Sequence, residues 1–321
     1  MSDQNPWSTC GDMGRCHAER HTTIGITLFN IRNGCLNEGH YNFDTAVDLI
    51  SEEPEYCDLM VFCEAKEFAW RGGAGRHGFT NALKAATGRP LAGELGSFGR
   101  GEFGPIVVYD PNVVDICVFQ GYGAPFIARD KRNWCTARIR ESGAHCGILP
   151  QHWAYQDGDL RLAEAKETAW VGGLSFPALI LGDFNSIASG GSEEPHCDFA
   201  LMRDHERYNK AQWTPDSKPG RPIVADTRAL DFLLGHWQSE CSSRIDGRGL
   251  HDLAEIAHYT YGERGALVST VNDGIDLGGG LRIDRALINT PGRSTLVRGS
   301  FLVRSTPPPF DHKIVRFKLH L

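Results

Sequence analysis

The chain has 321 residues, 41% of them hydrophobic and 23% charged, and its formal net charge is −7. This is the composition of an ordinary globular protein with a large core. The excess of acids excludes a general basic affinity for nucleic acid, so any such binding needs a local positive patch. No apolar run is long enough to span a bilayer, and no leader-like segment opens the sequence. We therefore expect a cytoplasmic protein without a membrane partner.

The first 21 residues are polar and show no hydrophobic period, which predicts a flexible tail. The tail contains Cys10, Cys16, His17 and His21, which could bind zinc, but structural zinc sites have more closely spaced pairs. No Cys-x-x-Cys pair occurs among the ten cysteines, and a reducing cytosol keeps such thiols free. We expect one domain over residues 22–321 and see no sign of an obligate protein partner.

Short apolar strands alternate with helices in the first third of the chain. We expect strands over 24–30 and 57–63, separated by a helix over 43–50 and followed by a short helix over 78–87. Glycines are frequent in residues 93–104 and predict a surface loop.

A hairpin is expected next, with strands over 106–109 and 113–119 that turn around Asp110-Pro111. Residues 188–225 are polar and too long for an ordinary connection, which predicts a functional loop insertion. Apolar strands with helices between them predict an α/β fold in which two packed sheets are covered by helices. The remaining expected elements are strands over 136–139, 145–149, 177–181, 282–288 and 314–319, and helices over 160–170, 229–237 and 250–256.

Polar side chains stand at or near the ends of many of these strands. The clearest case is Gly182-Asp-Phe-Asn185, where Asp183 and Asn185 would share one face of a continuing strand. Each such residue has a structural explanation of its own, such as a turn cap or an ion pair. Repetition at one type of position is better explained by convergence on a site. The set comprises Asn30, Glu64, His152, Asp183, Asn185, Asp284, Asp311 and His312.

These residue types suit the hydrolysis of a phosphate ester. The carboxylates of Glu64, Asp183 and Asp311 are hard oxygen ligands for Mg²⁺, with Mn²⁺ or Ca²⁺ as alternatives. The amides of Asn30 and Asn185 can bind phosphate oxygens without adding negative charge. The two histidines can move protons near neutral pH. The sequence has no serine nucleophile elbow, P-loop or dinucleotide motif that would favour another chemistry.

The order and spacing of the motifs resemble those of the endonuclease/exonuclease/phosphatase superfamily, typified by DNase I, over about residues 24–319. The resemblance implies a four-layer α/β sandwich, with two mixed sheets face to face and helices outside. It also implies a metal-dependent phosphodiesterase or phosphatase. The motifs are Phe29-Asn-Ile-Arg32, Glu64, His152, Gly182-Asp-Phe-Asn185, Ile283-Asp-Arg285 and Asp311-His312.

The resemblance implies a role for each metal-site residue. Glu64 matches the principal metal-binding glutamate of the family, and Asp311 matches the second metal carboxylate. Asn30 matches a phosphate-facing amide close to the metal, and Asn185 a second such amide. Asp183 matches the residue that binds a metal or orients the attacking water.

The remaining roles concern proton transfer. Asp284 matches the partner that orients His312, which would donate to the phosphate or transfer a proton. His152 matches a histidine of the DNase-like, sphingomyelinase-like and inositol-phosphatase-like branches. Glu102 would be its acidic partner, one residue away from the family spacing. The sequence departs from the family where Cys63 replaces the usual glutamine and Phe310 the usual serine, both beside the metal carboxylates.

Two classes of substrate fit these motifs. Arg32 would share the face of Asn30 on a continuing strand and bind a flanking phosphate of a nucleic acid. The net acidity favours instead a small phosphorylated metabolite or a lipid headgroup. The DNase-like motifs favour the nuclease, whereas a binding module without activity would not need to retain all these polar positions. Further basic residues for a nucleic-acid patch are Lys66, Arg71, Arg76 and Arg100.

Overall fold

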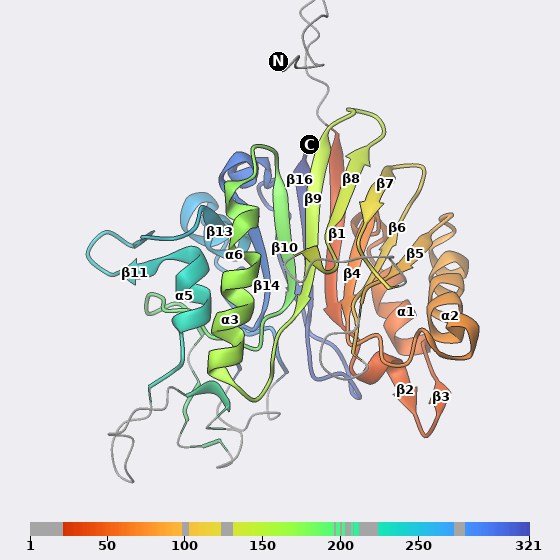
Figure 1. The fold of residues 1–321 in the computed structure, drawn as a ribbon, viewed down its shortest axis with the longest axis horizontal. Helices are drawn as coiled ribbons and strands as arrows, with labels where there is room; N and C mark the ends of the chain where they lie inside the picture. Colours follow the sequence, from red (N-terminus) through yellow and green to blue (C-terminus); the bar gives the residue numbers. More distant parts are fainter. Residues whose placement is uncertain are drawn as a thin grey trace, which may run out of the picture.

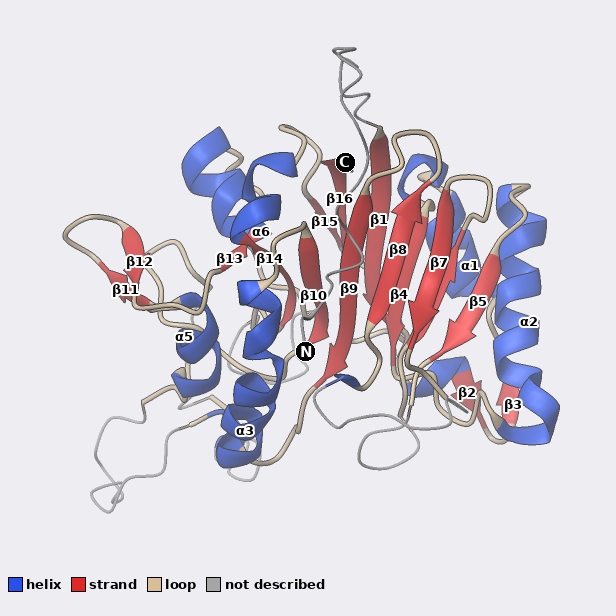
Figure 2. Ribbon diagram, turned by 45° about the horizontal axis from the view of Figure 1, so that its top comes forward, coloured by secondary structure: helices blue, strands red, loops and turns tan. Residues whose placement is uncertain are grey.

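Two mixed sheets of six strands each pack face to face, and helices cover their outer faces in this computed structural model (Figure 1). Figure 2 shows the helices outside the two sheets. The α/β sandwich predicted from the sequence is therefore confirmed. The structure describes residues 22–97, 103–122, 131–195, 197–199, 201–202, 207, 209–211, 224–272 and 280–321.

The first sheet contains both ends of the domain. Strand β1 pairs in parallel with β4 and antiparallel with β16, so the last strand lies beside the first. Helices α1 (Asp44–Ser51) and α2 (Trp70–Thr87) cover its outer face (Figure 1). Its strands, in spatial order, are β15 (Leu302–Arg304), β16 (Ile314–His320), β1 (Thr23–Asn30), β4 (Leu59–Cys63), β6 (Ile106–Tyr109) and β5 (Ala92–Leu95).

The second sheet is built from the middle of the chain. Helices α3 (Gly158–Thr168) and α5 (Arg228–Leu234) pack on its outer face. The short helix α6 (Leu253–Glu255) follows β13 and continues into a π-helical turn, Ile256–Thr260. The strands, in spatial order, are β13 (Leu250–Asp252), β14 (Asp284–Asn289), β10 (Ala178–Asp183), β9 (His145–His152), β8 (Cys135–Ile139) and β7 (Val114–Phe119).

Short elements connect these layers. Two small hairpins are formed by β2 (Leu36–Asn37) with β3 (His40–Tyr41) and by β11 (His236–Gln238) with β12 (Ser243–Ile245). Single 3₁₀ turns occur at Asn33–Cys35, Pro54–Tyr56, Ala169–Gly173 and Thr290–Thr295. Within the described ranges, the helices are all too short or too polar to cross a membrane.

The alternation of side chains along the strands separates the core between the sheets from the cores under the helices. On β1, Ile24, Ile26 and Leu28 point into the core between the sheets, whereas Phe29 points outwards against the α1 and α2 layer. On β10 the same alternation sends Leu181 inwards. The period of two then places Asn30, the last residue of β1, and Asp183, the last residue of β10, on the inner face.

Four expectations about elements are wrong. Helix α2 begins at Trp70, with left-handed backbone at residues 71–73, instead of at residue 78. The glycine-rich stretch starts with strand β5, which pairs with β6. The expected hairpin over 106–119 does not form, because β6 pairs with β4 and β5 while β7 pairs with β8 in the other sheet. The expected helix over 250–256 begins with strand β13.

The chain crosses between the sheets at Asp110, and its contacts explain the crossing. The Asp110 carboxylate accepts from Nε of Arg89 at 2.8 Å and from the backbone N–H of Asn112 at 2.9 Å. These bonds turn the chain at the end of β6 and direct β7 onto the second sheet. Asp110-Pro111 is therefore a turn, as predicted, but one that joins two sheets.

Candidate active site

The inner faces of both sheets end in polar residues at the same edge. On the second sheet, Asp183 of β10 is the register partner of His152 on β9 and of Asp284 on β14. Each of the three residues lies an even number of positions from the inward-facing apolar residues of its own strand, so it faces inwards as well. Asn30 occupies the matching position at the end of β1 in the first sheet. Strand geometry alone therefore brings four predicted residues to one place.

The side-chain amide of Asn30 connects the two sheets. Its Nδ2 lies 3.0 Å from Oε1 of Glu64 and 3.2 Å from Oδ2 of Asp183, and donates to both carboxylates. Asn30 is fully buried. Since the three residues come from different strands, this one donor fixes the separation of two acids that would otherwise repel each other.

Glu64 lies one residue beyond β4 and has a left-handed backbone, with φ of 61°. This turn brings its carboxylate back over the strand ends. Its Oε2 accepts from the backbone N–H of Asn33 at 2.7 Å. Two donors therefore hold Glu64 in a defined orientation.

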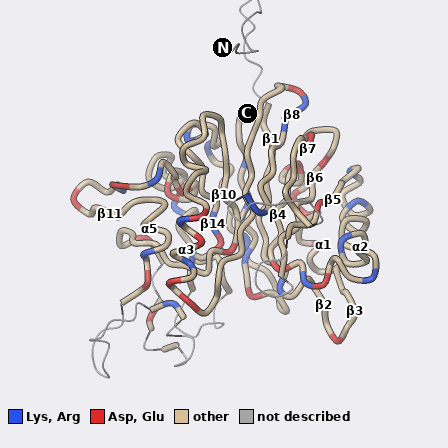
Figure 3. The backbone as a smooth tube through the Cα atoms, viewed as in Figure 1, with Lys and Arg blue, Asp and Glu red and all other residues tan. Residues whose placement is uncertain are grey.

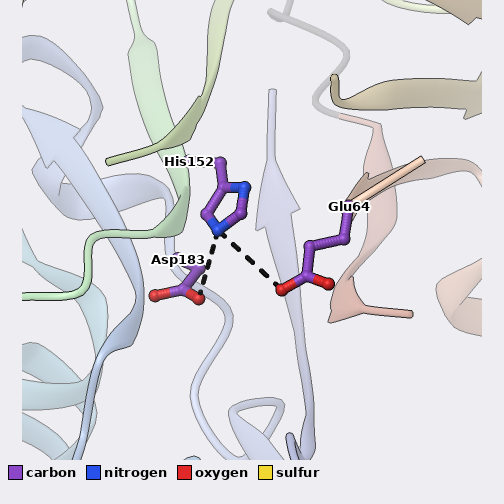
Figure 4. A group of neighbouring side chains, drawn as sticks. All are labelled: Glu64, His152 and Asp183. Carbon is purple, nitrogen blue, oxygen red and sulfur yellow. Dashed lines mark ion pairs between the residues drawn. The ribbon is translucent and has the colours of Figure 1, made fainter. Parts of the chain in front are cut away.

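His152 lies between Glu64 and Asp183 (Figure 4). Its Nε2 is 3.9 Å from Oε1 of Glu64 and 3.8 Å from Oδ2 of Asp183. One ligand atom from each of the three residues lies within 4.8 Å of the others. A cluster of two carboxylates and an imidazole at this spacing fits a divalent cation.

Asp311 also lines the cavity at the strand ends. Its Oδ1 is buried and has no hydrogen-bond partner among the described residues. Burial raises the pKa of its carboxyl group, and the nearby Glu64 adds to that effect. A hard cation bound here would supply the missing partner of this oxygen and reduce the repulsion between Asp311 and Glu64. The predicted metal ligands therefore fit Mg²⁺ or Mn²⁺.

His312 and Asp284 form a buried pair. Nδ1 of His312 lies 2.8 Å from Oδ2 of Asp284, and its Nε2 lies 3.7 Å from Oδ2 of Asp183. Burial acts to lower the pKa of His312, but the surrounding carboxylates, Asp284 first, outweigh it and raise the pKa to about 10. The surrounding carboxylates therefore favour the protonated form of His312, whose Nε2 faces the acidic cluster.

Asp284 is available to His312 because the neighbouring arginines have other partners. Arg282 and Arg285 bind the buried carboxylates of Glu194 and Asp252, in each case at 2.7 Å. An ion pair between Asp284 and one of these arginines, which their closeness in the sequence would allow, is therefore not formed.

Strand β10 ends at Asp183, so the motif Gly182-Asp-Phe-Asn185 does not continue as a strand. Oδ1 of Asp183 accepts from the backbone N–H of Asn185 at 2.8 Å, and Asn185 has φ of 48°. Both residues still line the cavity. The glycine is required by a close approach, because a Cβ on Gly182 would lie 1.8 Å from the carbonyl oxygen of Gln151 on β9.

Arg32 does not lie where a continuing strand would place it. Strand β1 ends at Asn30, whose Oδ1 accepts from the backbone N–H of Arg32 at 3.0 Å and turns the chain. The guanidinium of Arg32 donates to the carbonyl of Pro309 and lies 3.7 Å from Asp311. Glu102 and Arg100 lie outside the described residues, as do the four tail residues considered for zinc.

The two residues that depart from the family pattern pack in apolar surroundings. Sγ of Cys63 donates to the carbonyl of Gln151 at 3.4 Å, and burial raises the pKa of its thiol well above the usual range. The ring of Phe310 packs edge-on against Phe29, with centroids 5.0 Å apart. Neither residue replaces a ligand in the clusters described above.

Sequence analysis missed Lys210, which comes from the 188–225 segment. Its Nζ donates to Oδ1 of Asn185 at 2.8 Å and to the carbonyl of Asn185 at 3.0 Å. No local pattern marks this lysine in the sequence, because its position depends on long-range contacts. The described part of the segment also forms a β-bridge between Ala211 and Ala225.

The polar strand ends line a cavity of about 660 Å³, within the range typical of small-molecule sites. Beyond the cluster residues, its wall includes an aromatic side with Phe103, Trp153 and Tyr155. The ring of Phe103 lies edge-on to His152, with centroids 6.3 Å apart. The described polar residues of the wall are Glu64, His152, Gln156, Asp157, Glu164, Asp183, Asn185, Lys210, Asp311 and His312.

The structure is similar to solved structures along nearly its whole length. It aligns with ANGEL2, a 2′,3′-cyclic phosphatase, at a TM-score of 0.52 and 16% identity, covering 94% of this chain and 96% of that chain. It aligns with an AP endonuclease from Archaeoglobus fulgidus at a TM-score of 0.51 and 15% identity, covering 92% of this chain and 98% of that chain. For the endonuclease/exonuclease/phosphatase from Bacteroides vulgatus the TM-score is 0.51 and the identity 13%, with 94% and 99% covered.

No protein-family model matches the sequence, and no curated protein matches it either. The similarity to solved structures is thus one of fold. The chain has the fold of the endonuclease/exonuclease/phosphatase superfamily, in agreement with the resemblance of its motifs.

Proposed function

We propose that the protein is a divalent-metal-dependent phosphoester hydrolase. The main support is the convergence of Glu64, His152 and Asp183 within 4.8 Å, at the edge where the two sheets meet. Asn30 bridges the two acids of this cluster, and Asp311 lines the same cavity. Two proteins with this fold are named as a 2′,3′-cyclic phosphatase and an AP endonuclease. Both names refer to chemistry at a phosphate ester.

Glu64 and Asp311, with Asp183 and Asn30 beside them, are the residues that would hold Mg²⁺ or Mn²⁺. A bound cation of this kind polarises a phosphoryl oxygen and stabilises the charge that develops on it. The protonated His312 would donate from Nε2 to a phosphoryl oxygen, while Asp284 keeps its ring in place through Nδ1.

The remaining residues would handle water and the leaving group. The carboxylate of Asp183 would accept a proton from the attacking water, whose oxygen forms the new bond to phosphorus. The ester P–O bond breaks on the opposite side, and the leaving oxygen takes a proton from solvent. His152, whose Nε2 lies 3.8 Å from Oδ2 of Asp183, would donate to a phosphoryl oxygen on the side of the attacking water. Asn185 would hold a phosphoryl oxygen with its Nδ2–H.

The charge of the cavity favours a small phosphorylated substrate. Its described wall contains five carboxylates, of Glu64, Asp157, Glu164, Asp183 and Asp311, but a single lysine and no arginine. A long polyanion needs a continuous basic groove. Figure 3 shows acidic and basic residues interspersed along the described chain, without a stripe of lysine and arginine.

A nucleic acid remains the second candidate, because two basic residues lie next to the cavity wall. Arg32 is close to Asp311, and Nζ of Lys66 lies 5.6 Å from the ring centroid of Phe103. Either residue could contact a phosphate that flanks the scissile bond.

Hydrolysis assays with defined substrates test the proposal. Purified protein is incubated with Mg²⁺, Mn²⁺ or EDTA and with p-nitrophenyl phosphate, bis-p-nitrophenyl phosphate, single-stranded DNA or RNA. Release of nitrophenol that requires metal, without strand cleavage, supports a small substrate. Strand cleavage supports the nuclease, and no hydrolysis of any of these substrates contradicts the proposal. Activity that persists in the Glu64→Gln variant, purified in parallel, comes from contaminants.

A further inference from the structure

Lys210 is a buried lysine at the active site. Its side chain is among the buried charged groups, 3% exposed, which is rare for lysine without a dedicated partner. The ammonium contacts Asn185 twice, at 2.8 and 3.0 Å, and lies 4.8 Å from the ring centroid of Tyr155. A residue of the 188–225 segment is therefore fixed against a polar side chain of the cavity.

These contacts determine which way the amide of Asn185 is turned. A lysine ammonium has three donors and no acceptor, so the side-chain atom of Asn185 that faces it has to be the oxygen. Nδ2 then lies on the other side of the amide, where it donates to the carbonyl of Trp153 at 3.2 Å. Its second N–H remains for the cavity that Asn185 lines.

Without the lysine, one of the two contacts that select this orientation is lost, and the carbonyl of Trp153 alone opposes a half-turn rotation of the amide. Oδ1 would then face the cavity, and an amide oxygen repels the phosphoryl oxygens of a substrate. The ammonium of Lys210 therefore helps to keep the Nδ2–H of Asn185 turned towards the substrate.

The contacts of the neighbouring backbone hold Lys210 in position. Its carbonyl accepts from the backbone N–H of Asp226 at 2.8 Å. The guanidinium of Arg161, a buried residue of α3, donates to the carbonyl of Asn209 at 2.6 Å and to that of Tyr155 at 3.0 Å. One arginine therefore holds both the cavity wall and the backbone next to the lysine.

We propose that Lys210 is a positioning residue that turns the amide nitrogen of Asn185 towards the phosphoryl group of the substrate. Lys210, from the 188–225 segment, then supplies part of the active site. This inference rests on the proposed hydrolase function, but it concerns the contribution of one residue and is tested separately.

A double-mutant cycle tests the coupling. The variants Lys210→Met, Asn185→Ala and the combination are compared with the wild type in kcat and KM, on whichever of the substrates above the wild type hydrolyses. We expect Lys210→Met to lower kcat by about 10², the usual effect of misplacing a reacting group by about 1 Å. In the Asn185→Ala background the same change should have almost no further effect, because there is no amide left to orient.

The controls separate this role from a structural one. Lys84→Met removes an exposed lysine on α2 and should leave kcat unchanged. If Lys210→Met does not fold, judged by its thermal melt, Lys210→Gln replaces it in the cycle, since its neutral amide no longer selects one orientation of Asn185. Added ethylammonium should partly restore kcat to Lys210→Ala, whereas ethanol should not.

The possible failures are distinguishable. If the losses in kcat of the two single variants multiply in the double variant, or if Lys210→Met keeps the wild-type kcat, the positioning role is wrong. The proposed hydrolase function is not affected by either result. A wild-type protein that hydrolyses none of the substrates would instead overturn the proposed function.

Discussion

Asn30, the last residue of β1, donates a hydrogen bond over 3.0 Å to Glu64, which directly follows the neighbouring strand β4 and is 34 positions away in the chain. The same Nδ2 reaches Asp183 of the opposite sheet. The distance between the two acids is thus set by one buried amide.

The Asn30→Ala variant should lose most of the hydrolytic activity. Glu64 and Asp183 would lose their shared donor, repel each other and move apart, and the phosphate would lose a nearby amide. We expect kcat to fall by about 10²–10³, the range found when one preorganised donor is removed. Steady-state kinetics measure it, and Asn81→Ala, an exposed amide on α2, is the matched control. Full activity in Asn30→Ala would contradict a role for this amide.

The Glu64→Gln variant should bind a divalent metal more weakly. The change keeps the shape of the side chain but removes its charge. Changes to groups that only orient metal ligands already cost about 10–100-fold in affinity, so the loss of a ligand's charge should weaken Mn²⁺ binding by at least about tenfold. Titration calorimetry with Mn²⁺ alone measures this without an activity assay. Glu240→Gln, an exposed acid in the β11–β12 loop, should bind as the wild type does.

The buried network of Asp252 and Arg282 predicts a dependence of stability on pH. Burial acts to raise the pKa of Asp252, but Arg282 and Arg285 outweigh it and lower the pKa to about 2. A carboxyl whose pKa is lower in the folded state stabilises the protein above its unfolded pKa of about 3.9 and loses that contribution as the pH falls towards 2. The free energy of unfolding should therefore decrease as the pH falls from about 5 to about 2.

The Asp252→Asn variant separates this contribution from that of other acids. It leaves two buried guanidinium groups short of one partner, and it should lose about 3–5 kcal/mol of stability at pH 7, the usual cost of breaking a buried ion pair. Its own stability should then change less than that of the wild type over the same acid range. Urea denaturation at several pH values measures both effects. Asp246→Asn, at an exposed position, should follow the wild-type curve.

The Gly182→Ala variant should be destabilised and inactive. Its Cβ would lie 1.8 Å from the carbonyl oxygen of Gln151, so strands β9 and β10 would have to separate next to His152 and Asp183. Overpacking of this kind typically costs about 1–3 kcal/mol. The control is Gly173→Ala, where a Cβ meets no atom within 4 Å. Thermal melts and assays of both variants check the prediction, and equal stability would refute the steric explanation of the motif.

The sequence allowed the sandwich and the convergence of polar strand ends to be predicted, for a local reason. An apolar run with a polar last residue, as in β1 and β10, has its inward and outward faces determined by the period of two. Parallel and register-paired strands then bring such ends together. Asn30, His152, Asp183 and Asp284 were predictable in this way, whereas their chemical roles stay predictions.

What could not be predicted depends on contacts between distant segments. The crossing from β6 to β7 resembles a hairpin locally, because the bonds of Asp110 with Arg89 are invisible in a short window. The turn of Arg32 away from the strand is a local exception, because it results from the side chain of Asn30 two residues before it. Lys210 lies in a polar stretch without periodicity, and long-range contacts such as those of Asn209 and Asp226 bring it to Asn185.

The place of β16 in the first sheet has a consequence for protein synthesis. It is the last strand in the chain, yet it lies between β15 and β1, and Asp311 and His312 come directly before it. A growing chain on the ribosome therefore holds β1 without its antiparallel neighbour until nearly the whole sequence has emerged. A nascent or prematurely terminated chain that stops before Asp311 lacks His312, the partner of Asp284, and also lacks strand β16. The complete cavity therefore exists only in the finished domain.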